Sequence, residues 1–229
     1  MTRVDPYSHQ TEARSSKDKW DARYRDAPEP MFGTEPSEYL RQIVARSDFA
    51  PRSALFLADG DGRNSRWLAA QGCDVSAVDL SEAATAKALD LDRAAGTKVQ
   101  RVAADLETWS GSGRRFDAVF IIALHSSQAV RRQAVETGIR HLEPGGWFVL
   151  EGFSTAQLSR RTMGPTSPDK LYDRSETLGW VQDTFEGETL DVVEALEGSV
   201  LLAEGDRHDG TAEMIRILAR RRRPAATTG

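Results

Sequence analysis

The sequence predicts an α/β fold, a Rossmann-like, doubly wound and mostly parallel sheet of seven strands. Apolar runs alternate with helical patterns over residues 54–153, and the run 116–124 is continuously apolar. Strands that alternate with helices form parallel sheets through right-handed crossovers, and strands buried on both faces are apolar throughout. Two further apolar runs, 190–202 and 212–219, flank a glycine-bearing turn. We expect them to add an antiparallel C-terminal hairpin at the sheet edge.

The N-terminal region predicts a helical cap. Residues 1–17 are polar and aperiodic, and we expect them to be flexible. Trp20 and Tyr24 are spaced as neighbours on one helix face, which predicts a short helix over 18–25. Prolines and a glycine end it, and a second helix is expected over 36–46, where the leading proline suits the first turn.

The elements of the sheet follow in order. Strands are expected at residues 54–57, 75–80, 99–104, 116–124 and 147–153. Helices are expected at residues 64–70, 81–95, 128–141 and 175–185. Ser81 is a good helix N-cap, Gly72 stops the helix before it, and a proline-bearing loop occupies 164–170. The pattern predicts one domain over 18–222, with flexible ends at 1–17 and 223–229.

The composition predicts a soluble, cytoplasmic protein. The 229 residues are 39% hydrophobic and 28% charged, with a net charge of −5, whereas nucleic-acid binding usually needs a basic stripe. No apolar run reaches the roughly 18–20 residues of a membrane span. We therefore expect neither a nucleic-acid nor a membrane partner, and a monomer or homodimer. The basic run Arg220–Arg223 is expected to be a solvated tail, and the lone Cys73 a buried, inert thiol.

Acidic residues stand at the predicted carboxyl ends of three successive strands. They are Asp59, Asp79 and Asp105, and ligands of open α/β sheets bind at that edge. Gly60 and Gly62 lack the Cβ that would keep the backbone away from a ligand. A carboxylate at Asp79 can accept hydrogen bonds from both ribose hydroxyls, and one at Asp105 can accept from the exocyclic amine of adenine. The pattern indicates a nucleoside site.

The chemistry of the glycine turn favours S-adenosyl-L-methionine (SAM) over a dinucleotide. Dinucleotide sites favour G-x-G-x-x-G, with the pyrophosphate on a helix N-terminus. Here Ser65 takes the third glycine position, and Asp59 and Asp61 would repel a pyrophosphate. An ammonium and a sulfonium suit these carboxylates better. We expect Asp59 to contact the methionine end of SAM, with S-adenosyl-L-homocysteine (SAH) as the product.

The motifs together resemble class I SAM-dependent methyltransferases. The resemblance is carried by Gly60-Asp61-Gly62-Arg63-Asn64, Val78-Asp79-Leu80-Ser81, Ala104-Asp105-Leu106, Phe116-Asp117 and Leu142-Glu143-Pro144-Gly145-Gly146. A second set of residues resembles the tellurite-resistance and thiopurine methyltransferase-like branch. It consists of Trp20, Arg23-Tyr24, Phe32-Gly33-Thr34-Glu35-Pro36, Tyr39-Leu40, Gly164-Pro165, Ser167-Pro168 and Leu171-Tyr172. The resemblance covers roughly 18–220. It implies a methyltransferase whose cofactor contacts are Gly60, Gly62, Arg63, Asn64, Asp79, Leu80, Ala104, Asp105 and Leu106.

The first loop departs from the family pattern. Phe56 stands where the family carries an acidic residue that orders the turn or the methionine ammonium, and Ala58 replaces the first glycine. Asp59 stands one position further on and is placed to compensate. The departure motivates an alternative hypothesis, a SAM-binding or regulatory protein without turnover. A nicotinamide-dependent oxidoreductase is a third hypothesis.

The acceptor side is expected after the fourth strand. His125 follows it and could orient or deprotonate an acceptor, since a histidine pKa of about 6.5 suits that task. Ile122 and Ala123 are expected to line the site through their carbonyls. The aromatic faces of Trp20 and Tyr24 can close over a sulfonium, although packing on the core explains them equally well.

The resemblance implies a small-molecule acceptor, for example a chalcogen oxyanion, a thiol or a natural product. We expect residues 18–40 and 155–175 to form a mobile cover over it. The histidines are scattered without ligand spacing, so no metal site is predicted. We expect His208 to be exposed in a turn, and Arg131 and Arg132 to be solvated on a helix.

Overall fold

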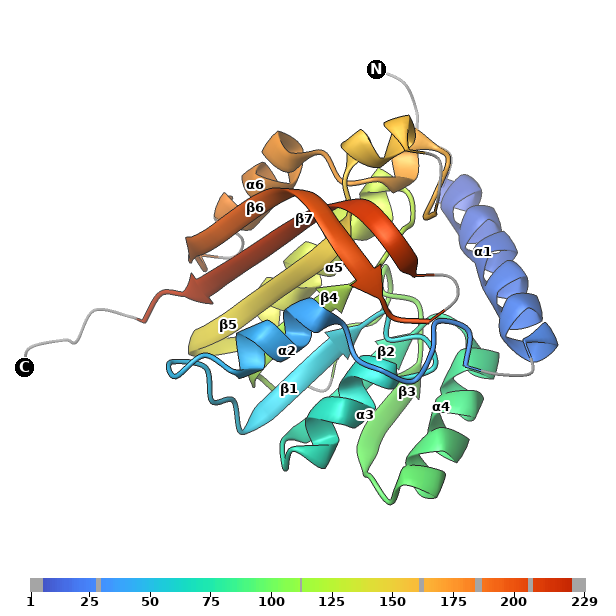
Figure 1. The fold of residues 1–229 in the computed structure, drawn as a ribbon, viewed down its shortest axis with the longest axis horizontal. Helices are drawn as coiled ribbons and strands as arrows, with labels where there is room; N and C mark the ends of the chain where they lie inside the picture. The colour runs from blue at the N-terminus through green and yellow to red at the C-terminus, as the bar shows by residue number, and fades with distance from the viewer. Residues whose placement is uncertain are drawn as a thin grey trace, which may run out of the picture.

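A computed structural model describes residues 6–27, 30–111, 113–160, 163–183, 187–205 and 208–223. It contains one seven-stranded sheet in the order β3-β2-β1-β4-β5-β7-β6 (Figure 1). The strands are β1 (Ser53–Leu57), β2 (Asp74–Asp79), β3 (Val99–Ala103), β4 (Phe116–Ile122), β5 (Leu142–Phe153), β6 (Leu190–Ala203) and β7 (Asp209–Arg221). Strands β1 to β5 pair in parallel, and β7 pairs antiparallel with both β5 and β6. The predicted fold class is confirmed.

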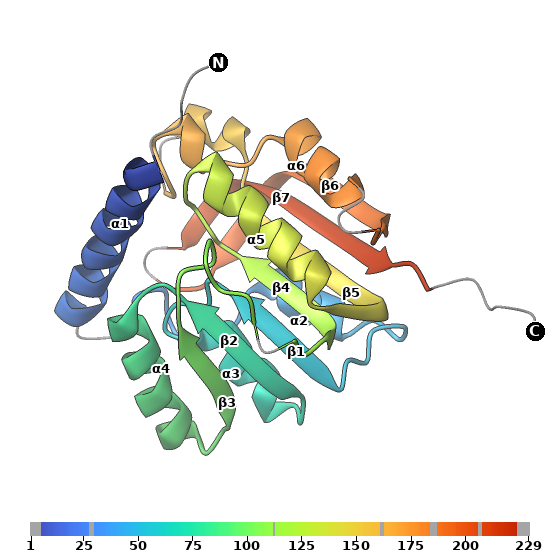
Figure 2. The same ribbon diagram turned by 180° about the vertical axis from the view of Figure 1, so that it is seen from behind.

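Helices cover both faces of the sheet. They are α1 (Pro6–Asp26), α2 (Glu38–Val44), α3 (Arg63–Ala70), α4 (Glu82–Ala95), α5 (Gln128–Arg140) and α6 (Arg174–Gln182), with short 3₁₀ turns η1 (Thr155–Ser159) and η2 (Pro168–Lys170). Helices α2 and α3 lie in front of the sheet in Figure 1, and α5 and α6 lie in front of it when seen from behind in Figure 2. None of the helices in the described ranges is long and apolar enough to cross a membrane.

Strand β1 shows why its sequence is continuously apolar. Leu55 and Leu57 pack into the core beneath α5 and α6, whereas Ala54 and Phe56 pack into the core beneath α2 and α3. Side chains of a strand alternate between faces, so a strand covered on both faces must be apolar at every position. Phe56 stacks on Phe120 with ring centroids 4.5 Å apart. The side chain that departs from the family pattern therefore serves the core.

The N-terminal helix is longer than the sequence predicts. Helix α1 begins at Pro6 rather than at residue 18, so most of the segment 1–17 that we expected to be flexible is helical, and 1–5 lie outside the described residues. Asp21 supplies tertiary contacts that no helical periodicity reveals. It accepts hydrogen bonds from the Ser81 hydroxyl (2.6 Å) and the Ala83 amide (3.0 Å), at the N-terminus of α4. This contact docks α1 across the end of the sheet.

Other boundaries differ by a few residues. Strand β5 begins at Leu142 and includes the Pro-Gly-Gly run that we expected to precede it, with a register shift against β4 between Phe116 and Ala118. The helix expected over 175–185 ends at Gln182, and residue 185 lies outside the described residues.

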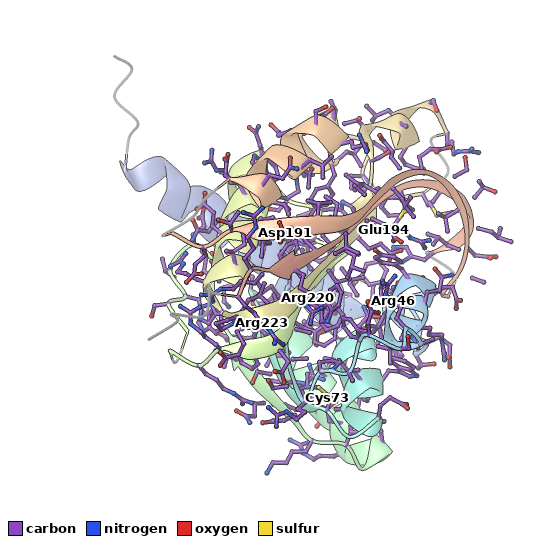
Figure 3. The ribbon with its side chains drawn as sticks, turned by 90° about the vertical axis from the view of Figure 1, so that its left-hand side faces the viewer. Arg46, Cys73, Asp191, Glu194, Arg220 and Arg223 are labelled. Atoms are coloured by element: carbon purple, nitrogen blue, oxygen red, sulfur yellow. The ribbon has the colours of Figure 1, made fainter. Side chains whose placement is uncertain are left out.

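The basic run Arg220–Arg223 is not the solvated tail that the sequence suggests. Arg220 lies over the sheet (Figure 3), where its guanidinium stands 4.7 Å from the centroid of the Trp147 ring. Arg221 is buried and donates to the Leu142 carbonyl. Arg220 and Arg221 thus end strand β7 and pack on the sheet, whereas Arg222 and Arg223 follow the strand and are exposed.

Candidate functional site

A tight turn joins β1 to α3 at the carboxyl edge of the sheet. Ala58, Gly60 and Gly62 have φ values of 58°, 60° and 82°, the left-handed conformation that glycine adopts most easily. Asp79, at the end of β2, accepts hydrogen bonds from the backbone amides of Gly60 and Ser81, each at 2.8 Å. Asp79 therefore fixes the turn against the neighbouring strand.

The carboxylate of Asp79 is poorly solvated. Desolvation is the largest effect on it and raises its pKa to about 6, although the two backbone donors act in the opposite direction. The nearby charges of Asp59 and Asp61 raise the pKa further. Three carboxylates therefore lie close to one turn, and Arg101 neutralises one of them, Asp59.

Asp59 lies beneath the turn rather than free above it. Its side chain, 3% exposed, pairs with Arg101 at 2.7 Å and accepts a hydrogen bond from the Ser65 hydroxyl. Arg101 also pairs with Asp92 of α4 at 2.6 Å. Burial raises the pKa of Asp59 despite the charge of Arg101, and within the described residues its second oxygen, Oδ1, has no hydrogen-bond partner.

The start of α3 binds a segment that we call the strap, residues 30–37. Asp61 accepts from the Met31 amide and Asn64 accepts from the Ser37 amide, each at 2.8 Å. Arg63 donates to the Glu35 carbonyl at 2.9 Å and pairs with Glu204 at 2.6 Å. The side chains of Arg63 and Asn64, which the resemblance implies to be cofactor contacts, therefore hold the strap at the start of α3.

Tyr24 of α1 covers the glycine turn. A Cβ placed on Gly60 would lie 2.5 Å from the tyrosine hydroxyl, and the Tyr24 side chain is buried. Trp20 lies one helical turn earlier, with its ring centroid 6.1 Å from that of Tyr24. Both aromatic residues expected to close over the cofactor are thus at the edge of the sheet, and Tyr24 makes the closer contact.

The loop after β3 lies beside Asp79. The Ala104 amide donates to the Asp79 carbonyl at 2.8 Å, and Asp105 is half-buried, with one oxygen accepting from the Glu107 amide. Leu106 is buried in the core beneath α5 and α6. Leu80 is half-buried next to Asp79. The structure therefore brings the predicted ribose and adenine residues together.

Backbone groups engage both ring nitrogens of His125. Its Nδ1 lies 3.2 Å from the Lys170 carbonyl, and its Nε2 accepts from the Phe153 amide at 3.4 Å, so both ring nitrogens of the neutral imidazole are used. Desolvation lowers the pKa of His125 to about 3. Ala123, before it, has a φ of 60° and donates its amide to the Glu151 carbonyl, while Ile122 is buried. His125 acts as a support for the end of β5.

Two further expectations about charged side chains were wrong. Arg131 is 2% exposed and donates to the carbonyls of Ser126 and Asp169, at 2.7 and 2.6 Å, while Arg132 is on the exposed side of α5. His208 is 7% exposed and lies against the rings of Phe32 and Phe153, with centroid distances of 4.9 and 5.6 Å. Contacts between segments distant in the sequence bury these residues, so local pattern carries no signal for them.

Other reactive groups lie away from this edge. Cys73 is half-buried and lies apart from the hairpin (Figure 3), and burial raises the pKa of its thiol to about 11. Among the described residues, no group of three or more histidine, cysteine or acidic side chains is placed to hold a metal ion.

Comparison with known proteins agrees with this geometry. Residues 54–146 match the family described as a methyltransferase domain. None of the curated proteins matches the sequence. A solved structure reported with the conversion of a disulfide bond into a thioacetal group during echinomycin biosynthesis gives a TM-score of 0.71 at 17% identity, covering 92% of this chain and 93% of that chain.

Two named methyltransferase-fold neighbours are similar. The N-methyltransferase NodS from Bradyrhizobium japonicum, solved with SAH, gives a TM-score of 0.66 at 16% identity and covers 90% of this chain and 97% of its own. TehB from Haemophilus influenzae gives a TM-score of 0.63 at 16% sequence identity, and the match covers 89% of this chain and 66% of TehB. The fold is therefore the Rossmann-like methyltransferase fold. Likeness at this identity does not select the tellurite and thiopurine branch, which stays a prediction.

Proposed function

We propose that this protein is a SAM-dependent methyltransferase that transfers a methyl group to a small-molecule acceptor. The observation that carries the proposal is the bond from the Gly60 amide to Asp79 at the carboxyl edge of the sheet, within the segment that matches a methyltransferase domain. The proposal includes a cytoplasmic location, a monomer or homodimer, and neither a nucleic-acid nor a membrane partner. It also includes the tellurite-resistance and thiopurine methyltransferase-like branch, which the sequence motifs favour.

The donor and acceptor groups at this edge fit SAM. Each oxygen of Asp79 accepts one backbone hydrogen bond and has a second lone pair for a ribose hydroxyl. Asp59 Oδ1 is a buried carboxylate oxygen without a partner among the described residues, which suits the methionine ammonium. Asp105 can accept from the adenine amine with its second oxygen. We therefore assign Asp59, Gly60, Gly62, Asp79 and Asp105 to the cofactor.

Binding requires the N-terminal cover to move. The space between Asp59, Gly60, Asp79, Thr85 and Arg101 is too narrow for a water molecule, and Tyr24 lies above the turn. Helix α1 is held there by the buried Asp21, through two hydrogen bonds to the start of α4. We propose that α1 and the strap open to admit the cofactor and then close over it.

Bound SAM would supply a methyl group that is already activated by the sulfonium charge. The protein has to hold the acceptor in line and exclude water, and such positioning can lower a barrier by roughly 7–11 kcal/mol. Tyr24 and the strap cover the glycine turn, where the cofactor is proposed to bind.

The proposal is tested by SAH formation. Purified protein incubated with SAM and a panel of thiols, phenols, amines and selenite should release SAH and a methylated product with at least one acceptor. Tight SAH binding without any product would favour the alternative, a SAM-binding protein without turnover, which Phe56 and Ala58 motivate. Binding of NADH without binding of SAH would contradict both readings.

A further inference from the structure

A set of buried charges lies beneath the glycine turn. Arg101 of β3 stands between Asp59 of the turn and Asp92 of α4, and the side chains of all three are at most 5% exposed. Its Nη1 lies 2.7 Å from Asp59, while Nε and Nη2 lie 2.6 and 2.9 Å from the two oxygens of Asp92. Arg66 of α3 also pairs with Asp92, at 3.5 Å. We call these four side chains the buried ion network.

The buried ion network accompanies the departure of the first loop from the family pattern. Phe56 takes the position of the family's acidic residue and lies in the core, so Asp59 is the first carboxylate after β1. A buried carboxylate is destabilising unless a cation and hydrogen bonds compensate it. Arg101 supplies the cation and the Ser65 hydroxyl supplies a hydrogen bond, and both reach the same oxygen of Asp59, Oδ2. Arg101 therefore allows a carboxylate to be buried at this turn.

The other oxygen of Asp59 is left without a partner. Oδ1 is buried, and none of the described residues donates a hydrogen bond to it. Asp59, Asp79 and Arg101 border the same narrow space at the carboxyl edge of the sheet. Buried polar atoms almost always have a hydrogen-bond partner, so an unpartnered oxygen at this place indicates a donor that arrives with a ligand. The carboxylates of Asp61 and Asp79 lie near Asp59 and favour a donor that is cationic.

We propose that Arg101 is a positioning residue, which holds the Asp59 carboxylate by Oδ2 and thereby presents Oδ1 to the ammonium of the methionine part of SAM. Asp92 fixes the guanidinium, because the planar fork of arginine pairs with both oxygens of one carboxylate and still reaches a second. Arg66 in turn pairs with Asp92. The turn packs on this group so closely that a Cβ on Gly62 would lie 2.7 Å from Arg101 Cζ. This inference rests on the proposed function.

Arg101 also affects the charge of Asp59. Burial raises the pKa of the Asp59 carboxyl group, whereas the charge of Arg101 and the hydrogen bond from Ser65 lower it. Asp61 from the turn and Asp79 from β2 lie near the same group and oppose its ionisation. Loss of Arg101 would therefore favour a neutral carboxyl group, which is a weaker partner for an ammonium than a carboxylate is. The guanidinium thus supplies both the orientation and the charge that the ligand needs.

The experiment compares SAH with its deamino analogue, in which hydrogen replaces the α-amino group. Calorimetry of both ligands gives the ratio of their dissociation constants for each protein. The wild type should bind SAH at least about tenfold more tightly than the analogue, because only SAH makes the charge-assisted bond. In Arg101→Met this ratio should approach one, since SAH affinity falls while affinity for the analogue stays the same. Arg101→Lys keeps the charge but cannot bridge both carboxylates, so its ratio should be intermediate.

Arg221→Met is the matched control for the loss of a buried arginine. Arg221 is also buried and pairs with an acidic residue, Glu188. It lies at the opposite edge of the sheet, where it donates to the carbonyl of Leu142 at the start of β5. The ratio of the two dissociation constants should therefore be the same in Arg221→Met as in the wild type.

The comparison of the two ligands in the wild type does not depend on a variant folding, and equal affinities there would overturn the inference. A variant Arg101→Met that binds both ligands more weakly to the same extent would also overturn it, because a merely structural role predicts that result. Tighter SAH binding by Arg101→Met would do so too, since it would mean that Arg101 repels the ammonium. Failure of the wild type to bind either ligand would instead contradict the proposed function.

Discussion

In the proposed function, Asp79 is the residue on which cofactor binding most depends. Its pKa of about 6 lies above the usual value because desolvation opposes its charge, so the folded protein takes up a proton there more readily than the unfolded chain does. The contribution of Asp79 to stability is therefore present below its unfolded pKa of about 3.8 and is lost as pH rises through about 6. The ionised form that ribose hydroxyls need exists fully only above that pH.

SAH affinity should consequently fall in mild acid. Below pH 6 the dissociation constant should rise, approaching tenfold per pH unit, because one proton must leave Asp79 for each ligand bound. Calorimetric titrations between pH 5 and about 8 measure this. In Asp79→Asn the pH dependence should disappear. An affinity that stays constant across the range would show that ionised Asp79 does not bind the ligand.

Ala58 holds a backbone conformation that disfavours any side chain. With φ at 58°, alanine costs about 1–2 kcal/mol relative to its preferred conformations, part of which the flexibility of glycine in the unfolded chain offsets. Ala58→Gly should therefore raise the free energy of unfolding by about 0.5–1 kcal/mol in urea titrations. Ala86→Gly, in the exposed interior of α4, should lower it by about 1 kcal/mol. If Ala58→Gly lowered the free energy of unfolding as much as Ala86→Gly does, the backbone of Ala58 would not be strained.

Local sequence predicts the positions of some residues of the candidate site and carries no signal for others. Asp79 and Gly60 follow from strand ends and turn chemistry, which are local, and the structure joins them by one hydrogen bond. His125 occupies its predicted place after β4, but two backbone groups from β5 and η2 engage its ring. Glu204 and His208 face the site only because the hairpin folds back onto the strap, and no local pattern encodes that contact.

At the scale of elements, α1 is a docked cover rather than a flexible tail. Asp21 is buried and caps α4 from outside that helix. Burial opposes ionisation of Asp21, but hydrogen bonds from Ala83, Ser81 and Lys17 lower its pKa to about 2. The stability that Asp21 contributes is thus present above the unfolded pKa of about 3.8 and is lost as pH falls through about 2.

Asp21→Ala should release α1 from the sheet. Loss of the cap should lower the free energy of unfolding at pH 7 by about 1–2 kcal/mol, and amides of α1 should exchange with solvent faster. Hydrogen exchange and urea unfolding measure both effects. Asp18 is exposed on the same helix, so Asp18→Ala is the control and should change neither the amide exchange of α1 nor the free energy of unfolding. Unchanged exchange in Asp21→Ala would mean that other contacts hold α1.

The type of an element could be predicted where the apolar periodicity is strong. The boundaries of an element could not be predicted where tertiary contacts decide them. Strands β1 and β4 follow from continuous apolar runs because both of their faces are covered. The first half of α1 is polar and has no apolar stripe, so the sequence gives no sign of a helix there. The proline and glycines in β5 suggest a break, yet a register shift against β4 accommodates them.

At the scale of the whole molecule, one buried charge links the cover to the sheet. Glu151 of β5 accepts from the Ser37 hydroxyl of the strap and pairs with Arg216 of β7 at 2.9 Å. Arg63 and Glu204 join the strap to α3 and the hairpin. Movement of the strap would therefore affect both the glycine turn and the hairpin, which is the coupling expected if the strap opens to admit the cofactor.

The central claim is that the edge formed by Gly60 and Asp79 binds SAM. Calorimetric titration of SAH into the wild-type protein and Asp79→Ala tests it most directly. Charge-assisted hydrogen bonds contribute roughly 1.5–3 kcal/mol, so the variant should bind at least about tenfold more weakly, with circular dichroism confirming that it remains folded. Equal SAH affinity in the two proteins, or no binding by the wild type, would contradict the claim.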